Sequence, residues 1–258
     1  MTNVTRAAFL RSMVLGLCTA GLLAACGGGG ADDNTWSVGT EPAFPPFEST
    51  NASGELEGFD IDLMNAIAEK AGKTVDFQSL PFDGLIPALQ SGTIDAAISS
   101  ISITEERANT VDFSEPYIES GLAIAVADGN TEVTSLDDLK GKKIAAQIGT
   151  TGAATANEVP DATVSEFDSA PLALQELANG NVDAVINDAP VTKYAISTGN
   201  IPGVVVVGQQ LTSENYGIAL PKGSENLAAI NQAMAEIKAD GTYDAIYQKW
   251  IGEAPPAK

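Results

Sequence analysis

The sequence contains no histidine, and its two cysteines are Cys18 and Cys26. Catalytic Ser-His and Cys-His pairs are therefore excluded, because each needs an imidazole as its base. Cys18 lies in a segment that we expect to be removed, so an internal disulfide cannot form even in an oxidising compartment. The lack of histidine does not exclude a carboxyl group, such as that of Glu41, as a general acid.

Positive charge is also scarce. The 258 residues include 13 lysines and arginines against 34 acidic residues, and Arg107 is the only arginine beyond residue 25. Such acidity argues against nucleic acid and anionic membrane surfaces as partners. Beyond residue 25, no stretch is long and apolar enough to cross a bilayer. No pattern of residues predicts a metal or another cofactor.

Residues 1–25 have the features of a secretory signal. Arg6 and Arg11 precede an apolar run that is too short for a mature transmembrane helix, and the run ends in Leu-Ala-Ala before Cys26. This ending resembles the lipobox of bacterial lipoproteins, in which the cysteine is lipidated and becomes the first residue. An ordinary cleaved signal is the alternative. We expect the lipid to be the only membrane anchor, in the bacterial periplasm or at the cell surface, with residues 26–35 as a flexible tether.

The stretch over residues 99–107 is the first candidate for a binding site. A short apolar run, predicted as a buried strand, leads into a loop with three serines, Ser99, Ser100 and Ser102. Ser102 and Glu105 have the spacing of a capping box, which predicts that a helix starts here. Exposed amides and hydroxyls suit a carboxylate, and the guanidinium of Arg107 pairs with a carboxylate bidentately, as lysine cannot. On spacing alone, a surface arginine paired with a glutamate of its own helix is an equally good interpretation.

Residues 89–100 have a near-copy 88 positions later, at residues 177–188. Both copies contain a helix end, a glycine turn, an aspartate and a buried strand in the same order, which predicts two similar α/β lobes. The polar pairs that end the two copies are Ser99-Ser100 and Asn187-Asp188. They follow the carboxyl ends of strands, where open α/β sheets bind ligands. We therefore expect Arg107 and Asp188 to face one another across a cleft and to hold the two charged groups of an α-amino acid.

Apolar periodicity predicts alternating strands and helices along the rest of the chain, among them a strand over residues 143–147 and a helix over residues 242–251. Three prolines in residues 40–47 predict a stiff, irregular loop that displays Glu41, Phe44 and Phe47. The turn at residues 149–152 is no Walker loop, because no Gly-Lys-Ser/Thr follows it. The chain is expected to cross between the lobes twice, as in a hinge. Lobe 1 is predicted at residues 36–123 and 217–258, and lobe 2 at residues 124–216.

Nearly all of the mature chain resembles the polar amino-acid-binding proteins of bacterial ABC importers (extracellular solute-binding protein family 3), which include histidine-, lysine/arginine/ornithine- and glutamine-binding proteins. Each matching stretch is weak alone, but together they are highly specific. The stretches are 39–48, 58–63, 85–89, 94–96, 99–107, 111–117, 149–151 and 240–243. The resemblance implies an α/β, two-lobed periplasmic-binding-protein-like (type II) fold that closes on an amino acid. It also implies a monomer that delivers its ligand to ABC transporter permease subunits.

The resemblance also implies roles for individual residues. The ligand carboxylate is expected on Arg107, Ser102 and the amide of Thr151. The ammonium is expected on Asp188, with help from Ser100 or the carbonyl of Ser99. The side chain is expected between the rings of Phe44 and Phe82, and near its tip are expected Glu41, Gln147 and Asn187. Glu41 departs from the shorter aspartate that is common at its place in the family, so side-chain preference is left open by the resemblance.

The charges at the side-chain end rank the candidate ligands. No lysine or arginine lies in these loops, so nothing would neutralise a second ligand carboxylate placed beside Glu41. Arginine or lysine is predicted first, because a cationic side chain pairs with Glu41 and stacks on phenyl rings. Glutamine or histidine comes next, and glutamine leads if Glu41 is protonated or turned to solvent. Acidic ligands come last.

Two other classes share this kind of fold. A periplasmic enzyme resembling cyclohexadienyl dehydratase would need a general acid in the cleft, and turnover of prephenate or arogenate would reveal it. A sensory receptor domain would need a membrane span or an appended signalling domain, and we expect neither in this chain. We therefore expect a binding protein and not an enzyme.

Overall fold

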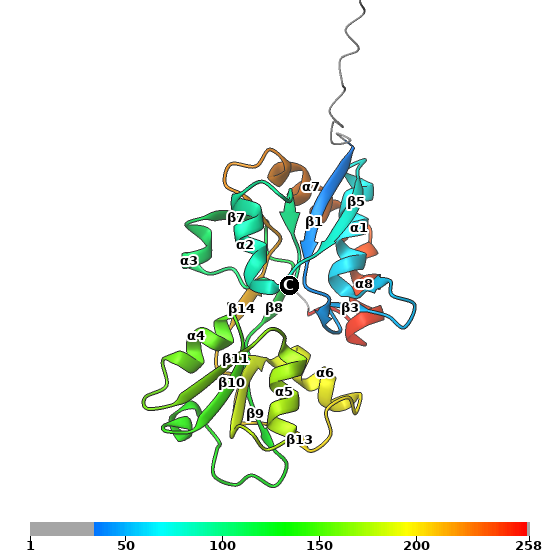
Figure 1. Ribbon diagram of the computed structural model, residues 1–258. Helices are drawn as coiled ribbons and strands as arrows, with labels where there is room; N and C mark the ends of the chain where they lie inside the picture. The colour runs from blue at the N-terminus through cyan, green and yellow to red at the C-terminus, as the bar shows by residue number, and fades with distance from the viewer. Residues whose placement is uncertain (1–33, 257–258) are drawn as a thin grey trace, which may run out of the picture. The chain divides into compact units, whose positions relative to one another are not determined.

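Two five-stranded sheets organise the protein, and the computed structural model describes residues 34–256 (Figure 1). The first sheet has the strand order β5-β1-β6-β15-β7, in which β1 is parallel to β5 and β6, and β15 is antiparallel to its neighbours. β1 begins at the last residue of the predicted tether. The strands are β1 (Thr35–Thr40), β5 (Thr74–Ser79), β6 (Ala96–Ala97), β7 (Val111–Phe113) and β15 (Ala219–Pro221).

The second sheet repeats this plan with the order β11-β10-β12-β9-β13. β10 is parallel to β11 and β12, and β9 runs antiparallel to β12 and β13. The strands are β9 (Leu122–Ala127), β10 (Lys143–Gln147), β11 (Thr163–Phe167), β12 (Ala184–Asp188) and β13 (Val204–Val207).

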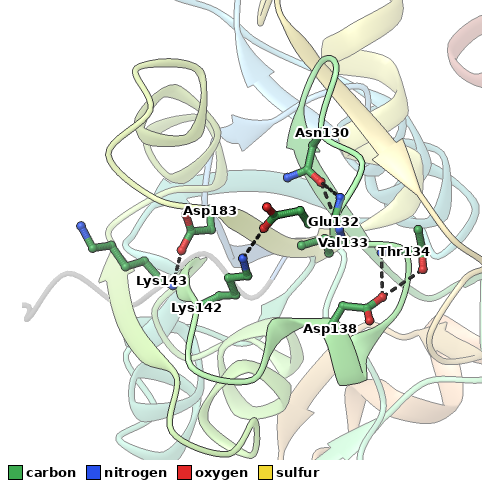
Figure 2. Close-up of polar contacts among 8 residues, drawn as sticks. All are labelled: Asn130, Glu132, Val133, Thr134, Asp138, Lys142, Lys143 and Asp183. Atoms are coloured by element: carbon green, nitrogen blue, oxygen red, sulfur yellow. Dashed lines mark hydrogen bonds and ion pairs between the residues drawn. The ribbon is translucent and has the colours of Figure 1, made fainter.

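The repeat predicted from the sequence recurs in the hydrogen bonds. Asp95, before β6, accepts a hydrogen bond from the backbone N–H of Ser37 in β1 at 2.8 Å. Its counterpart Asp183, before β12, accepts one from the N–H of Lys143 in β10, also at 2.8 Å (Figure 2). Each aspartate thus binds the neighbouring parallel strand at the same register, one residue before the pairs Val38–Ala96 and Ile144–Ala184.

Helices pack on each sheet, and their buried faces follow the apolar spacing. In α1 the side chains of Leu63, Met64 and Ile67 are fully buried, and α1 packs against β5, α7 and α8. The helices of the first sheet are α1 (Phe59–Lys70), α2 (Phe82–Gln90), α3 (Glu105–Ala108), α7 (Asn226–Ala239) and α8 (Thr242–Ile251). Those of the second are the 3₁₀ turn η1 (Leu136–Leu139), α4 (Thr151–Asn157), α5 (Ala170–Ala178) and α6 (Ala189–Ser197).

The proline-rich stretch differs from its prediction as an irregular loop. It contributes to a small three-stranded sheet of β2 (Ala43–Phe44), β3 (Glu48–Thr50) and β4 (Leu56–Glu57). β2 fits between the prolines because its two residues both keep their N–H groups. The ring of Phe47 is fully buried and packs on Phe59 with centroids 6.0 Å apart, so Phe47 is a core residue.

The chain passes between the two sheets through two short strands. β8 (Ile118–Ser120) leads from the first sheet into β9, and β14 (Glu214–Tyr216) leads from β13 back to β15. The two strands pair with one another antiparallel. Among residues 34–256, no helix combines the length and the apolar character that a membrane span needs.

Candidate functional site

One pocket collects side chains from both five-stranded sheets. The space between its walls that no atom fills amounts to about 280 Å³, a volume that includes open solvent. Nine of the eleven residues predicted to bind ligand line it, and Thr150 does so as well. The lining residues are Phe44, Phe82, Ser99, Ser100, Ser102, Arg107, Gln147, Thr150, Thr151 and Asp188.

Arg107 is held in the pocket wall by its own short helix, α3. The predicted capping box of Ser102 and Glu105 is wrong, because the cap is Thr104, whose hydroxyl accepts from the N–H of Arg107 at 3.2 Å. Ser102 cannot cap the helix because it forms an extended bridge with Tyr216.

The guanidinium of Arg107 makes contacts on two sides of the pocket. It donates to the carbonyl of Ser102 at 2.8 Å and to the carbonyl of Gly149 at 3.0 Å. It also lies over the ring of Phe82, 5.4 Å from its centroid. Burial lowers the pKa of Arg107, whereas the carboxylates of Asp188 and Glu214 oppose that shift. The group stays charged in any case, because arginine has so high an intrinsic pKa.

Asp188 supplies the opposite charge at the carboxyl end of β12. Its side chain accepts a hydrogen bond from the hydroxyl of Tyr216, which in turn accepts one from Ser120 at 2.8 Å. Burial raises the pKa of Asp188 to about 7, and the hydrogen bond from Tyr216 acts against this rise. Tyr216 carried no signal in the sequence, because its contact depends on how β14 passes the end of β12.

The serines after β6 are held from behind by two buried acids. The hydroxyl of Ser99 donates to Glu48 at 2.9 Å, and the N–H of Ser100 donates to Asp60 at 2.7 Å. Ser100 has a φ of 49°, in the left-handed region that side chains other than glycine adopt rarely. Neither Glu48 nor Asp60 was identified from the sequence as part of the site.

Of the three residues predicted near the tip of the ligand side chain, one lines the pocket and two do not. Gln147 lines the pocket and donates to Glu41 at 3.4 Å and to the carbonyl of Asp168 at 3.2 Å. Glu41 is 7% exposed and is not among the lining residues, and burial raises its pKa to about 7. Asn187 is also absent from the lining, and its amide donates to Thr192 of α6 at 3.1 Å. Neighbouring side chains of a strand point to opposite faces, so Asn187 faces away where Asp188 faces the pocket.

Two threonines open α4 beside Arg107. The hydroxyl of Thr150 caps the helix by accepting from the N–H of Ala153 at 3.1 Å. The hydroxyl of Thr151 donates to Glu214 of β14 at 3.0 Å. Glu214 is therefore a third carboxylate near the pocket, and no pattern of residues had indicated it.

The arrangement suits a small zwitterion with a polar tip. The guanidinium of Arg107 and the carboxyl group of Asp188 line the same pocket, together with two phenyl rings and several hydroxyls. Within residues 34–256, no group of three or more histidine, cysteine, aspartate or glutamate side chains is arranged to hold a metal ion. The fold and the pocket together define a two-lobed α/β binding protein for a small solute.

Comparison with known proteins agrees with that class. The family model of the bacterial extracellular solute-binding proteins, family 3, matches residues 36–253. A probable histidine-binding protein of Neisseria gonorrhoeae is 35% identical over 250 residues, covering 92% of this chain and 93% of that protein. The chain belongs to this family of solute-binding proteins, and the resemblance found in the sequence is confirmed.

Two solved structures agree in fold. An ancestral arginine-binding protein bound to arginine is 49% identical with a TM-score of 0.80, covering 84% of this chain and 98% of the other. An ancestral amino acid-binding protein that is a precursor of cyclohexadienyl dehydratase is 40% identical with a TM-score of 0.79, covering 84% and 96%. The predicted α/β, two-lobed class is therefore confirmed.

Proposed function

We propose that this protein captures a free, polar L-amino acid between two closing lobes and delivers it to the permease of an ABC importer. The observation that carries the proposal is that Arg107 and Asp188 both line one pocket. Relatives described as histidine-binding and arginine-binding support it.

In this proposal the two charged ends of the ligand are held on opposite sides. Arg107 binds the carboxylate, with the hydroxyl of Ser102 and the amide of Thr151. Asp188 binds the ammonium, with help from Ser100 or the carbonyl of Ser99. A guanidinium and a carboxylate give charge-assisted hydrogen bonds, which are about twice as strong as neutral ones.

Arginine or lysine is the preferred ligand in our proposal. Phe44 and Phe82 flank the side chain, and its tip lies toward Gln147, Glu41 and Asn187. Arg107 is the only cation that lines the pocket, whereas Glu41 and Glu214 add negative charge nearby. A second ligand carboxylate would therefore be unneutralised. Glutamine is the second choice, because the raised pKa of Glu41 allows a protonated, neutral partner.

The lobes are proposed to comprise residues 36–123 with 217–258, and residues 124–216. β8, near the end of the first segment, and β14, at the end of lobe 2, then form the hinge, and the protein acts as a monomer. The antiparallel pairing of β8 with β14 supports a hinge of two strands that bend together.

The proposed location is outside the bacterial cytoplasm, on a membrane through lipid on Cys26. Cys26, the signal at residues 1–25 and nearly all of the predicted tether lie outside the described residues. Replacing Cys26 by serine should release the protein from membranes into the soluble fraction. An unmodified mature terminus at another residue, found by mass spectrometry, would rule out the lipid anchor.

A dehydratase is the second candidate, and one observation favours it. Burial raises the pKa of Glu41 and of Asp188 to about 7, which suits a general acid at neutral pH. The similarity to a precursor of cyclohexadienyl dehydratase points the same way, although that precursor is itself an amino acid-binding protein. Turnover of prephenate or arogenate by the purified protein would establish this alternative.

Blocked ligands test the proposed binding mode directly. The protein is first freed of co-purified ligand and then titrated calorimetrically with arginine, N-acetylarginine and arginine amide. The acetyl group removes the ammonium and the amide removes the carboxylate, so each should weaken binding on the order of 30-fold or more. Equal affinity for all three would contradict the charge clamps at both ends.

A further inference from the structure

Two fully buried acids stand behind the serine turn of the pocket. Glu48, the first residue of β3, and Asp60, in the first turn of α1, are both 0% exposed. The titratable groups that face them are Glu41, Tyr117, Tyr216 and Tyr243, and none of these is a cation. Neither acid lines the pocket itself.

One oxygen of each acid is used to hold the turn. Oε1 of Glu48 accepts the hydroxyl of Ser99, whose oxygen also accepts the N–H of Glu41 at 3.0 Å. Oδ2 of Asp60 accepts the N–H of Ser100 and the hydroxyl of Tyr117, at 2.7 and 2.8 Å. These bonds hold Ser100 at its positive φ, a conformation that persists only where its surroundings impose it.

The other oxygen of each acid lacks a donor. Oε2 of Glu48, Oδ1 of Asp60 and the hydroxyl of Ser100 are all buried without a hydrogen-bond partner. Each of the two carboxyl groups shifts the pKa of the other, so they are direct neighbours. Two ionised carboxylates this close repel strongly in a dry interior. A single proton on Glu48 gives Oε2 a hydrogen to donate to Oδ1 of Asp60, so one proton satisfies both atoms and removes the repulsion.

The electrostatics of the two acids agree with this assignment. Burial and the neighbouring Asp60 raise the pKa of Glu48 well above its ordinary value. Burial also raises the pKa of Asp60, to about 7, while hydrogen bonds from Ser100, Tyr117 and Glu48 lower it. Glu48 is therefore the partner that keeps the proton.

We infer that Glu48 and Asp60 share one proton as an acid–carboxylate pair, and that this pair positions the Ser99–Ser100 turn for the ligand's ammonium group. The positioning role rests on the function proposed above. The pair puts one net negative charge behind the turn and holds the turn through the hydroxyl of Ser99 and the N–H of Ser100. Both acids are positioning residues that act through the two serines.

Infrared spectroscopy of the ligand-free protein tests the shared proton without any binding assay. A protonated carboxylic acid has a C=O stretch that is separate from the carboxylate bands. At a pH well above 7, where Glu41 and Asp188 are ionised, this band should persist in the wild type and vanish in Glu48→Gln. The variant Glu69→Gln, at an exposed position of α1, should keep it. Absence of the band from the folded wild type would overturn the shared proton.

Amide substitutions test how the pair supports the turn. In Glu48→Gln the new NH₂ donates to Asp60 as the acid did, and in Asp60→Asn the new NH₂ donates to an ionised Glu48. Each single variant should therefore keep its affinity for arginine within about threefold. The double variant sets two NH₂ groups against each other, and Glu48→Ala removes the acceptor of Ser99. Both should lose about tenfold or more.

Affinities are compared only for variants whose circular dichroism shows a folded protein at the assay temperature. Rescue by the single amides, with loss in the double variant, distinguishes positioning from a general loss of stability. Equal affinity in all four variants would overturn the positioning role. If the wild type bound no amino acid, the proposed function would fail, whereas the infrared result would still decide the shared proton.

Discussion

At the scale of single residues, carboxyl groups outnumber cations in and around the pocket. The guanidinium of Arg107 stands against the carboxyl groups of Asp188, Glu214 and Glu41. An amino acid brings one carboxylate and one ammonium, so a neutral ligand leaves the excess of negative charge unchanged. A cationic side chain reduces it, which is the physical basis for preferring arginine or lysine.

Replacing either charged residue of the clamp should weaken binding. Arg107→Lys keeps the charge but loses the planar fork, and Asp188→Asn keeps the shape but loses the charge. Removing one partner of a desolvated charge pair costs about 2–5 kcal/mol, so each variant should bind arginine on the order of 30-fold or more weakly in a calorimetric titration. Asp244→Asn, at an exposed position of α8, is the matched control and should bind as the wild type does. Near-native affinity in both clamp variants would rule out the proposed site.

Binding of a cationic ligand should depend on pH. Burial raises the pKa of Asp188 from its ordinary 3.8, and that of Glu41 from its ordinary 4.5, to about 7 in the folded protein. The ligand-free protein therefore holds protons on these groups below about pH 7, and a cation displaces them. Affinity for arginine should rise from about pH 5 to about pH 8 and then level off. Calorimetry in buffers of different ionisation enthalpy would count the released protons, and Glu41→Gln should release fewer. An affinity that is flat over this range would contradict the assignment.

The same raised pKa values make the stability of the folded protein depend on pH, in the direction opposite to that of the affinity. Because these acids bind protons more tightly in the folded than in the unfolded chain, their contribution to the free energy of unfolding falls as pH rises from about 4 to about 7.

Residue types predicted part of the site, and tertiary contacts determined the rest. The repeat and the lone arginine were enough to predict that Arg107, Asp188 and the serines lie in one pocket, as they do in the structure. The alternation along β12, with Asn187 turned away, depends on where the strand begins, which the sequence does not define. Tyr216, Glu48 and Asp60 touch the site only through chain segments that are distant in sequence, so no local pattern revealed them.

At the scale of elements, the chain segments beside β8 and β14 lie in close contact with one another. Gly121, between β8 and β9, has no room for a side chain, because an added Cβ would lie 1.9 Å from the carbonyl oxygen of Thr212. Leu122 donates its N–H to the hydroxyl of Thr212 at 3.0 Å, so the two segments are directly joined here.

Gly121→Ala should therefore force the segments apart. We expect a loss of about 1–3 kcal/mol in the free energy of unfolding, as for other overpacked sites, measured by urea titration. Gly84→Ala in α2 is the control, because its nearest neighbour would be an ordinary contact at 3.8 Å. It should leave stability unchanged or raise it. Equal stability in the two variants would show that the approach at Gly121 is not rigid.

Long periodic elements were easier to predict than short ones. The predicted helix at residues 242–251 coincides with α8, and the predicted strand at residues 143–147 coincides with β10. β2 and β4 have only two residues each, too few for an alternating pattern to be recognised. The start of α3 was misplaced because Ser102 and Thr104 are both plausible caps, and the bridge from Ser102 to Tyr216 decides between them.

At the scale of the whole molecule, the pocket is lined by residues from both sheets. The pocket wall takes Ser99, Ser100 and Arg107 from the first sheet and its loops, and Gln147, Thr151 and Asp188 from the second. A ligand that touches both sides favours whichever arrangement brings them together. We therefore expect saturating arginine to lower the radius of gyration in small-angle X-ray scattering. Arg107→Lys at the same arginine concentration should show a smaller decrease, and an unchanged radius in the wild type would contradict closure.

The central claim is that this pocket selects a polar amino acid and prefers a cationic side chain. The most direct measurement is competition of labelled arginine, bound to the ligand-free wild-type protein, by each of the twenty amino acids. We predict that arginine and lysine compete best, glutamine and histidine follow, and aspartate and glutamate compete least. Glutamate or leucine displacing the label better than both arginine and glutamine would contradict this account.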